Sequence, residues 1–406
     1  MRTAGLSCLV AVLLGLSACS SSPSAGPGPS ASAVPQSSAS TTPETGDEHA
    51  TAPAARPASV PLRAGERAVT LRLPGGPYRP VAPGEGRDDY RCFLIDPGFP
   101  RDVFVTGSDV LPGNPAVVHH AILFAVPPEQ VATAEAHDAA TPGRGWTCFG
   151  GSAVPGDGSS AGRALDSAPW LAAWAPGGGE TVFRQRTGKR LAAGSRVVLQ
   201  VHYNLREGGG PDDTTVRLRW MPGTAELRAL ETMLLVAPVE LPCTSQESGV
   251  LCDRSQSVLD LVARFGQGAG RTVAGLQLLC DGNMLAPRAG PTQSCDRRAP
   301  QDMVVRAVAG HMHLLGRSIR VQLSPGTPTE RTLLDRPVWD FDDQRATPLP
   351  RPVRVRRGDM LRVTCTHDAG LRSMLPELAD EEPRYVTWGE GTSDEMCLGI
   401  VQYTHD

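Results

Sequence analysis

Five of the nine histidines of this chain fall in three short apolar segments that have the composition of β-strands. The segments are 117–124 (VVHHAILF), 199–204 (LQVHYN) and 310–316 (GHMHLLG). A single histidine in such a run is usually a hydrogen-bonded core residue, because an unpaired polar group is costly to bury. Two pairs of histidines change this interpretation, since the neutral imidazole is a common metal ligand. The spacing therefore points to metal chemistry.

The two pairs differ in how a strand can present them. Residues i and i+2 of a strand face the same side, so His311 and His313 can bind one metal ion without a special turn. His119 and His120 are adjacent and would face opposite sides of a regular strand. They need a bend or a β-bulge to converge on one ion. In that half of the chain His202 is the only strong candidate for a third ligand.

The third ligand of the second pair is less evident from the residues. His367 and His405 are candidates, and Met396 in the segment 391–397 (GTSDEMC) is a better one. A methionine by itself is far more often a packing residue than a ligand. A thioether combined with imidazoles suits copper, especially Cu(I), and suits zinc poorly.

The cysteines fit an exported, disulfide-bonded protein. Of ten cysteines, Cys8 and Cys19 lie near the N-terminus, and the other eight are Cys92, Cys148, Cys243, Cys252, Cys280, Cys295, Cys365 and Cys397. An even number in an exported chain predicts disulfides, and the lack of any CxxC pair disfavours a four-cysteine zinc site.

Two of the disulfides can be assigned by their place beside the metal-binding segments. We predict Cys365–Cys397, which would hold the strands that carry Met396, and Cys92–Cys148, which would brace the strand of adjacent histidines. The four remaining cysteines allow three connectivities, of which we favour the local pairs Cys243–Cys252 and Cys280–Cys295.

Short strands must position these residues. Alternating apolar residues occur at 69–73, 216–220, 319–323 and 361–365, and 44 glycines and 37 prolines among 406 residues favour strands and turns over long helices. Helical periodicity is weak outside 128–136 and 256–264. Residues 357–359 (RGD) lie between two alternating runs and predict a hairpin turn. Residues 243–300 hold four cysteines and many turn-forming residues, which predicts an irregular region held together by disulfides.

These patterns predict an all-β fold of two tandem antiparallel β-sandwich domains. A break near Pro222 places the domains at 66–222 and 223–406. The formal net charge of −4, with no long run of one sign, gives no electrostatic footprint for nucleic acid.

The N-terminus predicts export. Arg2 precedes the apolar run 9–16 (LVAVLLGL), which is too short to span a bilayer and is typical of a signal peptide. It ends in LSAC, which resembles a bacterial lipobox, so we expect residues 1–18 to be removed and Cys19 to carry a lipid. The alternative is an ordinary secretory signal. Residues 19–65, rich in Ser, Pro and Ala, predict a disordered tether.

The motifs HHAILF, QVHYN, GHMHLLG and GTSDEMC, in this order, resemble the copper type II, ascorbate-dependent monooxygenases. That family includes dopamine β-monooxygenase and peptidylglycine α-hydroxylating monooxygenase. The likeness covers about residues 66–406 and is supported by DYRCF (89–93), WAPGG (174–178) and DFD (340–342). Any one motif is weak evidence; the ordered set is specific.

The resemblance implies two jelly-roll-like β-sandwich domains with one copper each. The first copper, which stores and delivers an electron, would be bound by His119, His120 and His202. The second, where oxygen binds and a C–H bond of the substrate is hydroxylated, would be bound by the catalytic residues His311, His313 and Met396. Ascorbate would reduce both ions.

The chain departs from the peptidylglycine branch at three positions. That branch holds a peptide carboxylate with an Arg two residues before the HxH motif, and uses an Asn and a Tyr after the ligand Met. Here Ala309, Leu398 and Ile400 occupy these positions. A C-terminal glycine peptide is therefore not expected, and a catecholamine does not suit a bacterial lipoprotein.

The predicted function is a copper-dependent monooxygenase that hydroxylates a small organic substrate with O₂ and ascorbate or another one-electron reductant. The alternative is a non-catalytic, extracytoplasmic copper-binding or storage lipoprotein, and a weaker one is a surface protein with structural metals. We expect a monomer outside the cytoplasm that contacts a bacterial membrane only through its lipid and binds no nucleic acid.

Overall fold

The computed structural model describes residues 59–82, 87–154, 165–175, 177–184, 186–206, 208–280, 283 and 286–405. The predicted signal peptide, Cys19 and most of the predicted tether lie outside these residues. All the described residues belong to one compact unit of the chain.

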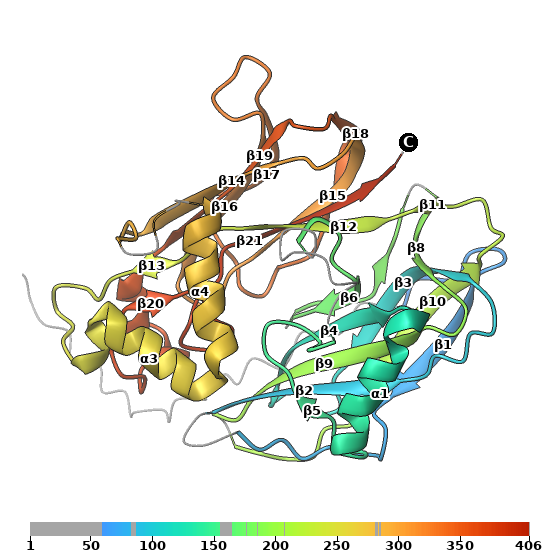
Figure 1. The fold of residues 1–406 in the computed structure, drawn as a ribbon, viewed down its shortest axis with the longest axis horizontal. Helices are drawn as coiled ribbons and strands as arrows, with labels where there is room; N and C mark the ends of the chain where they lie inside the picture. The colour runs from blue at the N-terminus through green and yellow to red at the C-terminus, as the bar shows by residue number, and fades with distance from the viewer. Residues whose placement is uncertain are drawn as a thin grey trace, which may run out of the picture. The chain divides into compact units, whose positions relative to one another are not determined.

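The first half of the described chain forms two β-sheets (Figure 1). One has the order β1-β10-β3-β8-β11, with β7 paired to β3; its strands are β1 (Arg67–Arg72), β3 (Val103–Leu111), β7 (Thr181–Val182), β8 (Thr187–Leu191), β10 (Thr215–Pro222) and β11 (Arg228–Ala229). The other has the order β5-β2-β9-β4-β6; its strands are β2 (Asp88–Ile95), β4 (Val118–Val126), β5 (Trp146–Thr147), β6 (Trp170–Trp174) and β9 (Arg196–Asn204). All pairs are antiparallel except β8–β11.

The two sheets pack face to face. Leu71, Val105 and Leu218 of the first sheet and Leu123 and Val201 of the second are buried in one hydrophobic cluster. Alternate residues of each strand enter this core, as the period-two pattern of the sequence requires. This part of the chain is therefore a β-sandwich.

The second half of the described chain also forms two main sheets, each of four strands. One sheet has the order β12-β21-β15-β18; its strands are β12 (Glu231–Val236), β15 (Met303–His311), β18 (Thr347–Val355) and β21 (Leu398–Thr404). The facing sheet has the order β14-β19-β16-β17; its strands are β14 (Thr292–Arg298), β16 (Gly316–Leu323), β17 (Arg331–Arg336) and β19 (Met360–His367). Val308 and Val401 of one sheet and Val321 and Val363 of the other share a buried core. A two-stranded sheet, β13 (Glu240–Leu241) with β20 (Val386–Thr387), lies beside them.

Few helices accompany the sheets. The α-helices that lie wholly within the described residues are α1 (Val131–Ala140), α3 (Arg254–Phe265) and α4 (Gln267–Cys280), and the short 3₁₀ turns there are η1 (Pro128–Gln130), η2 (Val250–Cys252), η3 (Ala369–Ser373) and η4 (Pro376–Leu378). The Asp253 side chain caps α3 by accepting hydrogen bonds from the backbone N–H of Ser255 and Gln256 at 2.9 and 3.0 Å. The predicted segments 128–136 and 256–264 are thus helical. The prediction of an irregular region was wrong for 254–280.

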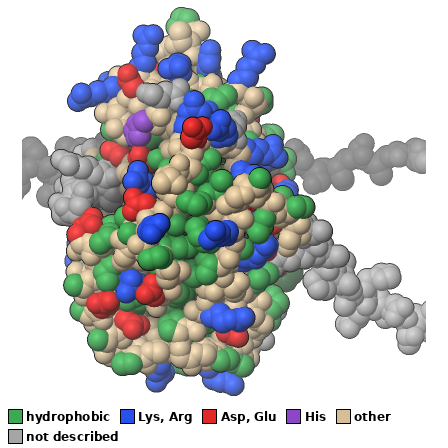
Figure 2. Space-filling model, turned by 90° about the vertical axis from the view of Figure 1, so that its right-hand side faces the viewer, with side chains coloured by type: hydrophobic (Ala, Val, Ile, Leu, Met, Phe, Trp, Pro, Cys, Tyr) green, Lys and Arg blue, Asp and Glu red, His purple; other side chains and the backbone are tan. Residues whose placement is uncertain are grey.

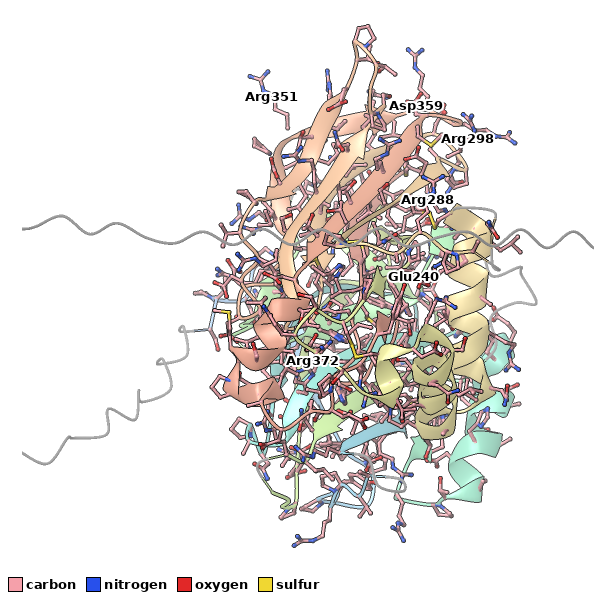
Figure 3. The ribbon with its side chains drawn as sticks, turned by 90° about the vertical axis from the view of Figure 1, so that its left-hand side faces the viewer. Glu240, Arg288, Arg298, Arg351, Asp359 and Arg372 are labelled. Carbon is pink, nitrogen blue, oxygen red and sulfur yellow. A yellow bond between two sulfur atoms is a disulfide. The ribbon has the colours of Figure 1, made fainter. Side chains whose placement is uncertain are left out.

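A buried carboxylate anchors α3 and α4 to the second sandwich. Glu240 of β13, labelled in Figure 3, accepts hydrogen bonds from Arg254 of α3 at 2.6 Å, from Gln277 of α4 at 2.7 Å and from the hydroxyl of Tyr385 at 2.9 Å. These partners satisfy a group whose burial would otherwise be costly. The helices are therefore fixed parts of the domain.

The predicted fold class is confirmed, and the four favoured disulfides are present: Cys92–Cys148, Cys243–Cys252, Cys280–Cys295 and Cys365–Cys397. The hairpin prediction for residues 357–359 was wrong. The strands on either side, β18 and β19, pair with β15 and with β14 and β16, respectively. The turn therefore joins the two sheets of the sandwich. The limit between the domains at 222 stays a prediction.

The described surface mixes charges of both signs. Figure 2 shows hydrophobic side chains gathered toward the middle of one face, with arginine and acidic side chains interspersed around them.

Candidate metal centres

A β-bulge brings the two adjacent histidines together. In the β4–β9 pair, Val118 faces Tyr203 and His120 faces His202, so His119 is the extra residue. A bulge places two residues of one strand opposite one of its partner and bends the chain locally. The bend that the adjacent pair required is confirmed.

The bulge makes three imidazoles converge. Nδ1 of His202 lies 3.1 Å from Nδ1 of His119 and 3.3 Å from Nδ1 of His120, and the three residues form a metal-sized cluster. Burial lowers the pKa of His119 and of His120 well below the ordinary value. Neutral imidazoles present lone pairs, so three nitrogens face a common point with the chemistry that a copper ion requires.

The outer nitrogen of His202 is held by a carboxylate. His202 is fully buried, and its Nε2–H donates to Asp88 Oδ1 at 2.8 Å. Burial alone would raise the pKa of Asp88, but the hydrogen bond and charge of His202 outweigh it and lower that pKa to about 2. The Tyr90 ring stacks on the imidazole at 4.0 Å. Such outer partners fix the tautomer and orientation of a ligand histidine.

The second pair lies at the end of β15. His311 is the last residue of this strand, His313 follows it, and Met396 comes two residues before β21. The Glu395 carboxylate clamps the two segments: its Oε2 accepts from the backbone N–H of His313 at 2.9 Å and of Met396 at 3.0 Å. Cys397 of the Cys365–Cys397 disulfide adjoins Met396. The HxH segment and the methionine are thus fixed to one carboxylate.

The hydrogen bonds found for the two second-site histidines within the described part of the chain engage Nδ1 of each ring. Nδ1 of His311 lies 2.5 Å from Gln344 Oε1, and Nδ1 of His313 lies 3.0 Å from the carbonyl oxygen of Asp394. Each Nδ1 therefore carries the proton. Burial lowers the pKa of His311 to about 4. Nε2 of His313 is buried and finds no hydrogen-bond partner among the residues that the structure describes. A buried lone pair of this kind fits a metal ligand.

The other two candidate ligands are engaged elsewhere. His367 is buried, with Nε2 3.2 Å from the carbonyl oxygen of Met396 and 3.4 Å from Glu395 Oε2. Burial alone would lower its pKa, but the hydrogen bond and charge of Glu395 raise it. His405 is exposed and pairs with Glu231. Met396 is mostly buried and lines a cavity together with His311. Met396 as the third ligand therefore stays a prediction.

The two centres are neighbours. The ring centroids of His120 and His311 are 6.3 Å apart, and both residues line the same cavity. A hydrogen-bonded link joins the centres: the Thr392 hydroxyl donates to Asp88 at 2.8 Å and accepts from the Asn204 amide at 2.7 Å. Thr392 belongs to the segment that carries Met396, and Asp88 holds His202.

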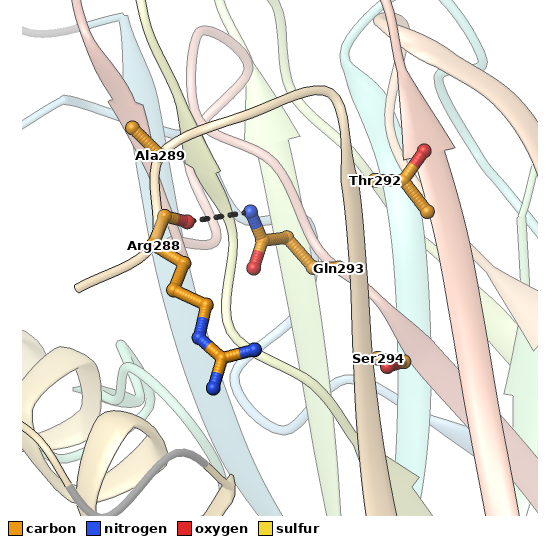
Figure 4. A pocket seen from close by; sticks show the side chains of 5 residues that line it. All are labelled: Arg288, Ala289, Thr292, Gln293 and Ser294. Atoms are coloured by element: carbon orange, nitrogen blue, oxygen red, sulfur yellow. Dashed lines mark hydrogen bonds between the residues drawn. The ribbon is translucent and has the colours of Figure 1, made fainter.

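A second, smaller hollow has no such chemistry. It has a volume of about 280 Å³ and is lined by five residues shown in Figure 4, Arg288, Ala289, Thr292, Gln293 and Ser294. The Gln293 amide donates to the carbonyl oxygen of Arg288 at 2.9 Å. No histidine, cysteine or carboxylate lies among these residues, so the hollow is not a candidate metal site.

The sequence patterns did not identify the residues that orient the ligands. Asn204, Thr392 and Glu395 lie inside the motifs but were not assigned roles, because a motif shows ligand types without their hydrogen bonds. Asp88 and Gln344 lie just outside the motifs DYRCF and DFD. Their only signal is that proximity, since the contacts span 114 and 33 positions of the chain.

The C-terminal part of the chain matches a family model. Residues 289–406 match the model of the copper type II ascorbate-dependent monooxygenase, C-terminal domain. This segment includes His311, His313 and Met396. The resemblance is thereby confirmed for residues 289–406, while for the preceding residues it rests on the motifs and on the histidine cluster.

The similar solved structures add nothing to this match. Allantoicase from Saccharomyces cerevisiae is 11% identical over 81% of each chain, with a TM-score of 0.18. The coconut allergen cocosin is 10% identical over 84% of this chain and 86% of its own, with a TM-score of 0.12. At such TM-scores neither likeness supports an argument on fold or function.

Proposed function

We propose that the chain is a copper-dependent monooxygenase that hydroxylates a C–H bond of a small organic substrate with O₂ and ascorbate or an equivalent one-electron reductant. The observation that carries the proposal is the convergence of three imidazole Nδ1 atoms beside a second pair of histidines, which lies near Met396 along one cavity wall. The family match of residues 289–406 supports it.

The overall reaction balances with external electrons. One oxygen atom enters the substrate as a hydroxyl group and the other leaves as water, which requires two electrons from two one-electron oxidations of the reductant and two protons. Copper, when bound, supplies the one-electron chemistry that O₂ reduction requires. His119, His120 and His202 would hold one ion, and His311, His313 and Met396 the other.

The chain's own residues prepare both sets for this chemistry. Asp88 and Gln344 hold the protonated nitrogens of His202 and His311 and thereby direct the other nitrogen of each ring. The thioether of Met396 favours Cu(I) over Cu(II), and a set of three imidazoles accepts both states. The cavity wall would exclude water from the reacting C–H bond.

The compartment follows from the disulfides. Four disulfides indicate an oxidising, extracytoplasmic location. Among the described residues no helix has the length and apolar character needed to cross a bilayer. We propose that a lipid on Cys19 anchors the protein to a bacterial membrane and that the protein acts as a monomer.

Copper stoichiometry and oxygen uptake test the proposal. After copper loading and removal of unbound metal by dialysis, the full chain should retain about two copper ions. His119→Ala and His313→Ala should each remove about one of them. His137→Ala, in α1, is the matched control and should leave the stoichiometry unchanged. Ascorbate-dependent oxygen uptake should require both ions. Preferential zinc binding, or one metal per chain, would overturn the two-centre proposal; two coppers without turnover on any substrate would favour copper storage.

A further inference from the structure

A single large cavity adjoins both candidate centres. It has a volume of about 1050 Å³, and its wall includes His120, His311 and Met396. A cavity of about 150 Å³ already binds benzene, and drug-sized ligands occupy sites of about 300–1000 Å³. The space beside the ligands therefore admits a molecule of several rings, and a reacting C–H bond must enter there.

The strand pair that carries the second site makes the wall apolar beside His311, and its polar side chain on the wall is Gln402. In the β15–β21 pair, His311 faces Leu398 and Ala309 faces Ile400. Opposed residues of an antiparallel pair project from the same side of the sheet, and all four line the cavity. No donor on these side chains can meet a carboxylate or phosphate, apart from the imidazole itself. An anion buried against Ala309, Leu398 and Ile400 would find no partner among these three side chains.

The charged side chains on the rest of the wall provide no buried cation that could pair with an anionic ligand. They are Lys189, Arg271, Arg345 and Glu390. The Lys189 ammonium donates to Thr232 Oγ1 at 2.5 Å and to the carbonyl oxygen of Trp170, and burial lowers its pKa to about 7. Both arginines are exposed to solvent, and Arg345 pairs with Asp343 at 2.7 Å. No buried, free cation is therefore left on the wall among the described residues.

The one carboxyl group on the wall among the described residues adds no positive charge. Glu390 forms no ion pair with any residue that the structure describes, and burial raises its pKa to about 7. Where Glu390 is ionised it repels an anionic ligand, and where it is protonated it gives that ligand no counter-charge. Aromatic rings of Phe149, Trp170, Trp174 and Trp388 complete the surface and favour flat apolar ligands.

We propose that the cavity selects large, apolar, non-anionic molecules, aromatic or polycyclic, and that Ala309, Leu398 and Ile400 set this selectivity beside His311. The oxidation of such a molecule rests on the proposed function, whereas its binding does not. A substituent on the ligand must be neutral or cationic, and the ring system provides most of the affinity through the hydrophobic effect.

A matched ligand pair tests the selectivity. 1-Pyrenebutanol and 1-pyrenebutyrate share one fluorescent ring system and differ in the terminal group. Titrated against the copper-free full chain at pH 7.5, the alcohol should bind at least tenfold tighter than the acid. Ile400→Arg places a cation on the wall at a partly exposed position and should reduce this ratio at least tenfold. Val338→Arg, at a site that is 79% exposed and outside the cavity, should leave it unchanged.

Each outcome separates this proposal from the proposed function. Equal or tighter binding of the acid by the unmodified chain, or no binding of either ligand, would overturn the substrate class whether or not the protein is an oxygenase. Selective binding of the alcohol without ascorbate-dependent oxygen uptake after copper loading would support the substrate class and count against the monooxygenase. An Ile400→Arg protein that retains its thermal transition and the original ratio would remove Ile400 from the proposal.

Discussion

The thioether of Met396 is the residue that best separates an oxygenase from a generic copper-binding protein. It is neutral and soft, and so stabilises Cu(I) relative to Cu(II). Met396→Ile keeps a similar volume and removes the sulfur, while the three-imidazole set is untouched. We expect the variant to keep the first copper and to lose almost all hydroxylation, measured as copper per chain and as ascorbate-dependent oxygen uptake.

A matched control uses a core methionine of the same sandwich. Met233 in β12 is fully buried in the hydrophobic core. Met233→Ile should cost about 1 kcal/mol of stability, as volume-conserving core changes do, and leave copper and activity intact. If Met396→Ile shows this same pattern, then Met396 is a packing residue and not a ligand.

Lys189 predicts a pH dependence of stability at a single residue. Its pKa is lowered by burial to about 7, from an ordinary value of 10.5. Between these values the unfolded chain binds a proton that the folded chain does not, so the free energy of unfolding rises with pH, by at most about 1.4 kcal/mol per pH unit. Below about pH 7 the cost of burying the charge is fully present.

The comparison with Lys189→Met isolates this contribution. Other groups titrate in both proteins, so urea unfolding at pH 7, 8 and 9 should show a steeper rise for the unmodified chain than for the variant. Parallel curves would mean that Lys189 keeps an ordinary pKa. A slope of the opposite sign would require a folded pKa above the unfolded one.

The sequence was sufficient to name the candidate ligands but not the residues that hydrogen-bond to them. The adjacent pair His119 and His120 predicts a bulge, because neighbouring residues of a regular strand cannot share a face. The bulge is present. Apart from its position next to the DYRCF motif, nothing in the sequence distinguishes Asp88 from the other aspartates, since its role depends on the β2–β9 register that places it near His202. Ligand type is local information, whereas orientation depends on register.

At the scale of elements, the Cys365–Cys397 disulfide ties β19 to the residue beside Met396. The half-cystines are 32 residues apart and fully buried. We expect Cys365→Ala/Cys397→Ala to lose about 2–4 kcal/mol of unfolding free energy, because the unfolded chain gains freedom. Copper at the second centre should weaken as well, since the methionine segment loses its covalent link. Urea unfolding and copper titration measure the two effects.

The pair Cys243–Cys252 provides the control for this double variant. It closes a loop of 9 residues, and neither cysteine lies on the cavity wall. Cys243→Ala/Cys252→Ala should lower stability and keep two coppers. Equal loss of copper from both double variants would show that general destabilisation, and not the position of β19, is responsible.

The strands were more predictable than their connections. Alternation at 319–323 and 361–365 identified β16 and β19, because one face of each strand enters the core. It did not identify partners, and so residues 357–359 were assigned to a hairpin although β18 and β19 lie in different sheets. The helix α4 was missed because Gly268, Gly270 and Gly275 lower its intrinsic helix propensity. Its packing against the sandwich outweighs that cost.

At the scale of the whole molecule, Thr392 connects the two centres. Its hydroxyl bonds Asp88, which holds His202, and accepts from Asn204. Thr392→Val removes both hydrogen bonds and leaves part-buried polar groups without their partner, which we expect to cost about 1–3 kcal/mol in unfolding free energy. Copper should also bind more weakly at the first centre, although the substitution lies in the segment of the second.

Thr392→Ser retains the hydroxyl and should restore both properties. Copper titration of His313→Ala proteins, which keep the first centre alone, reports on that centre directly when the Thr392 changes are added. Unchanged affinity in the Val variant would show that Asp88 orients His202 without help from the methionine segment.

The buried lysine has a practical consequence for covalent labelling. Lys189 is the only lysine in the sequence, and its side chain is 6% exposed. Acylating reagents that react with side-chain amines therefore meet no accessible lysine on the folded chain. Acylation of Lys189 requires the wall around it to open. The acylation rate of Lys189, measured by mass spectrometry, would therefore report how often the cavity wall opens. A bound apolar ligand should lower this rate.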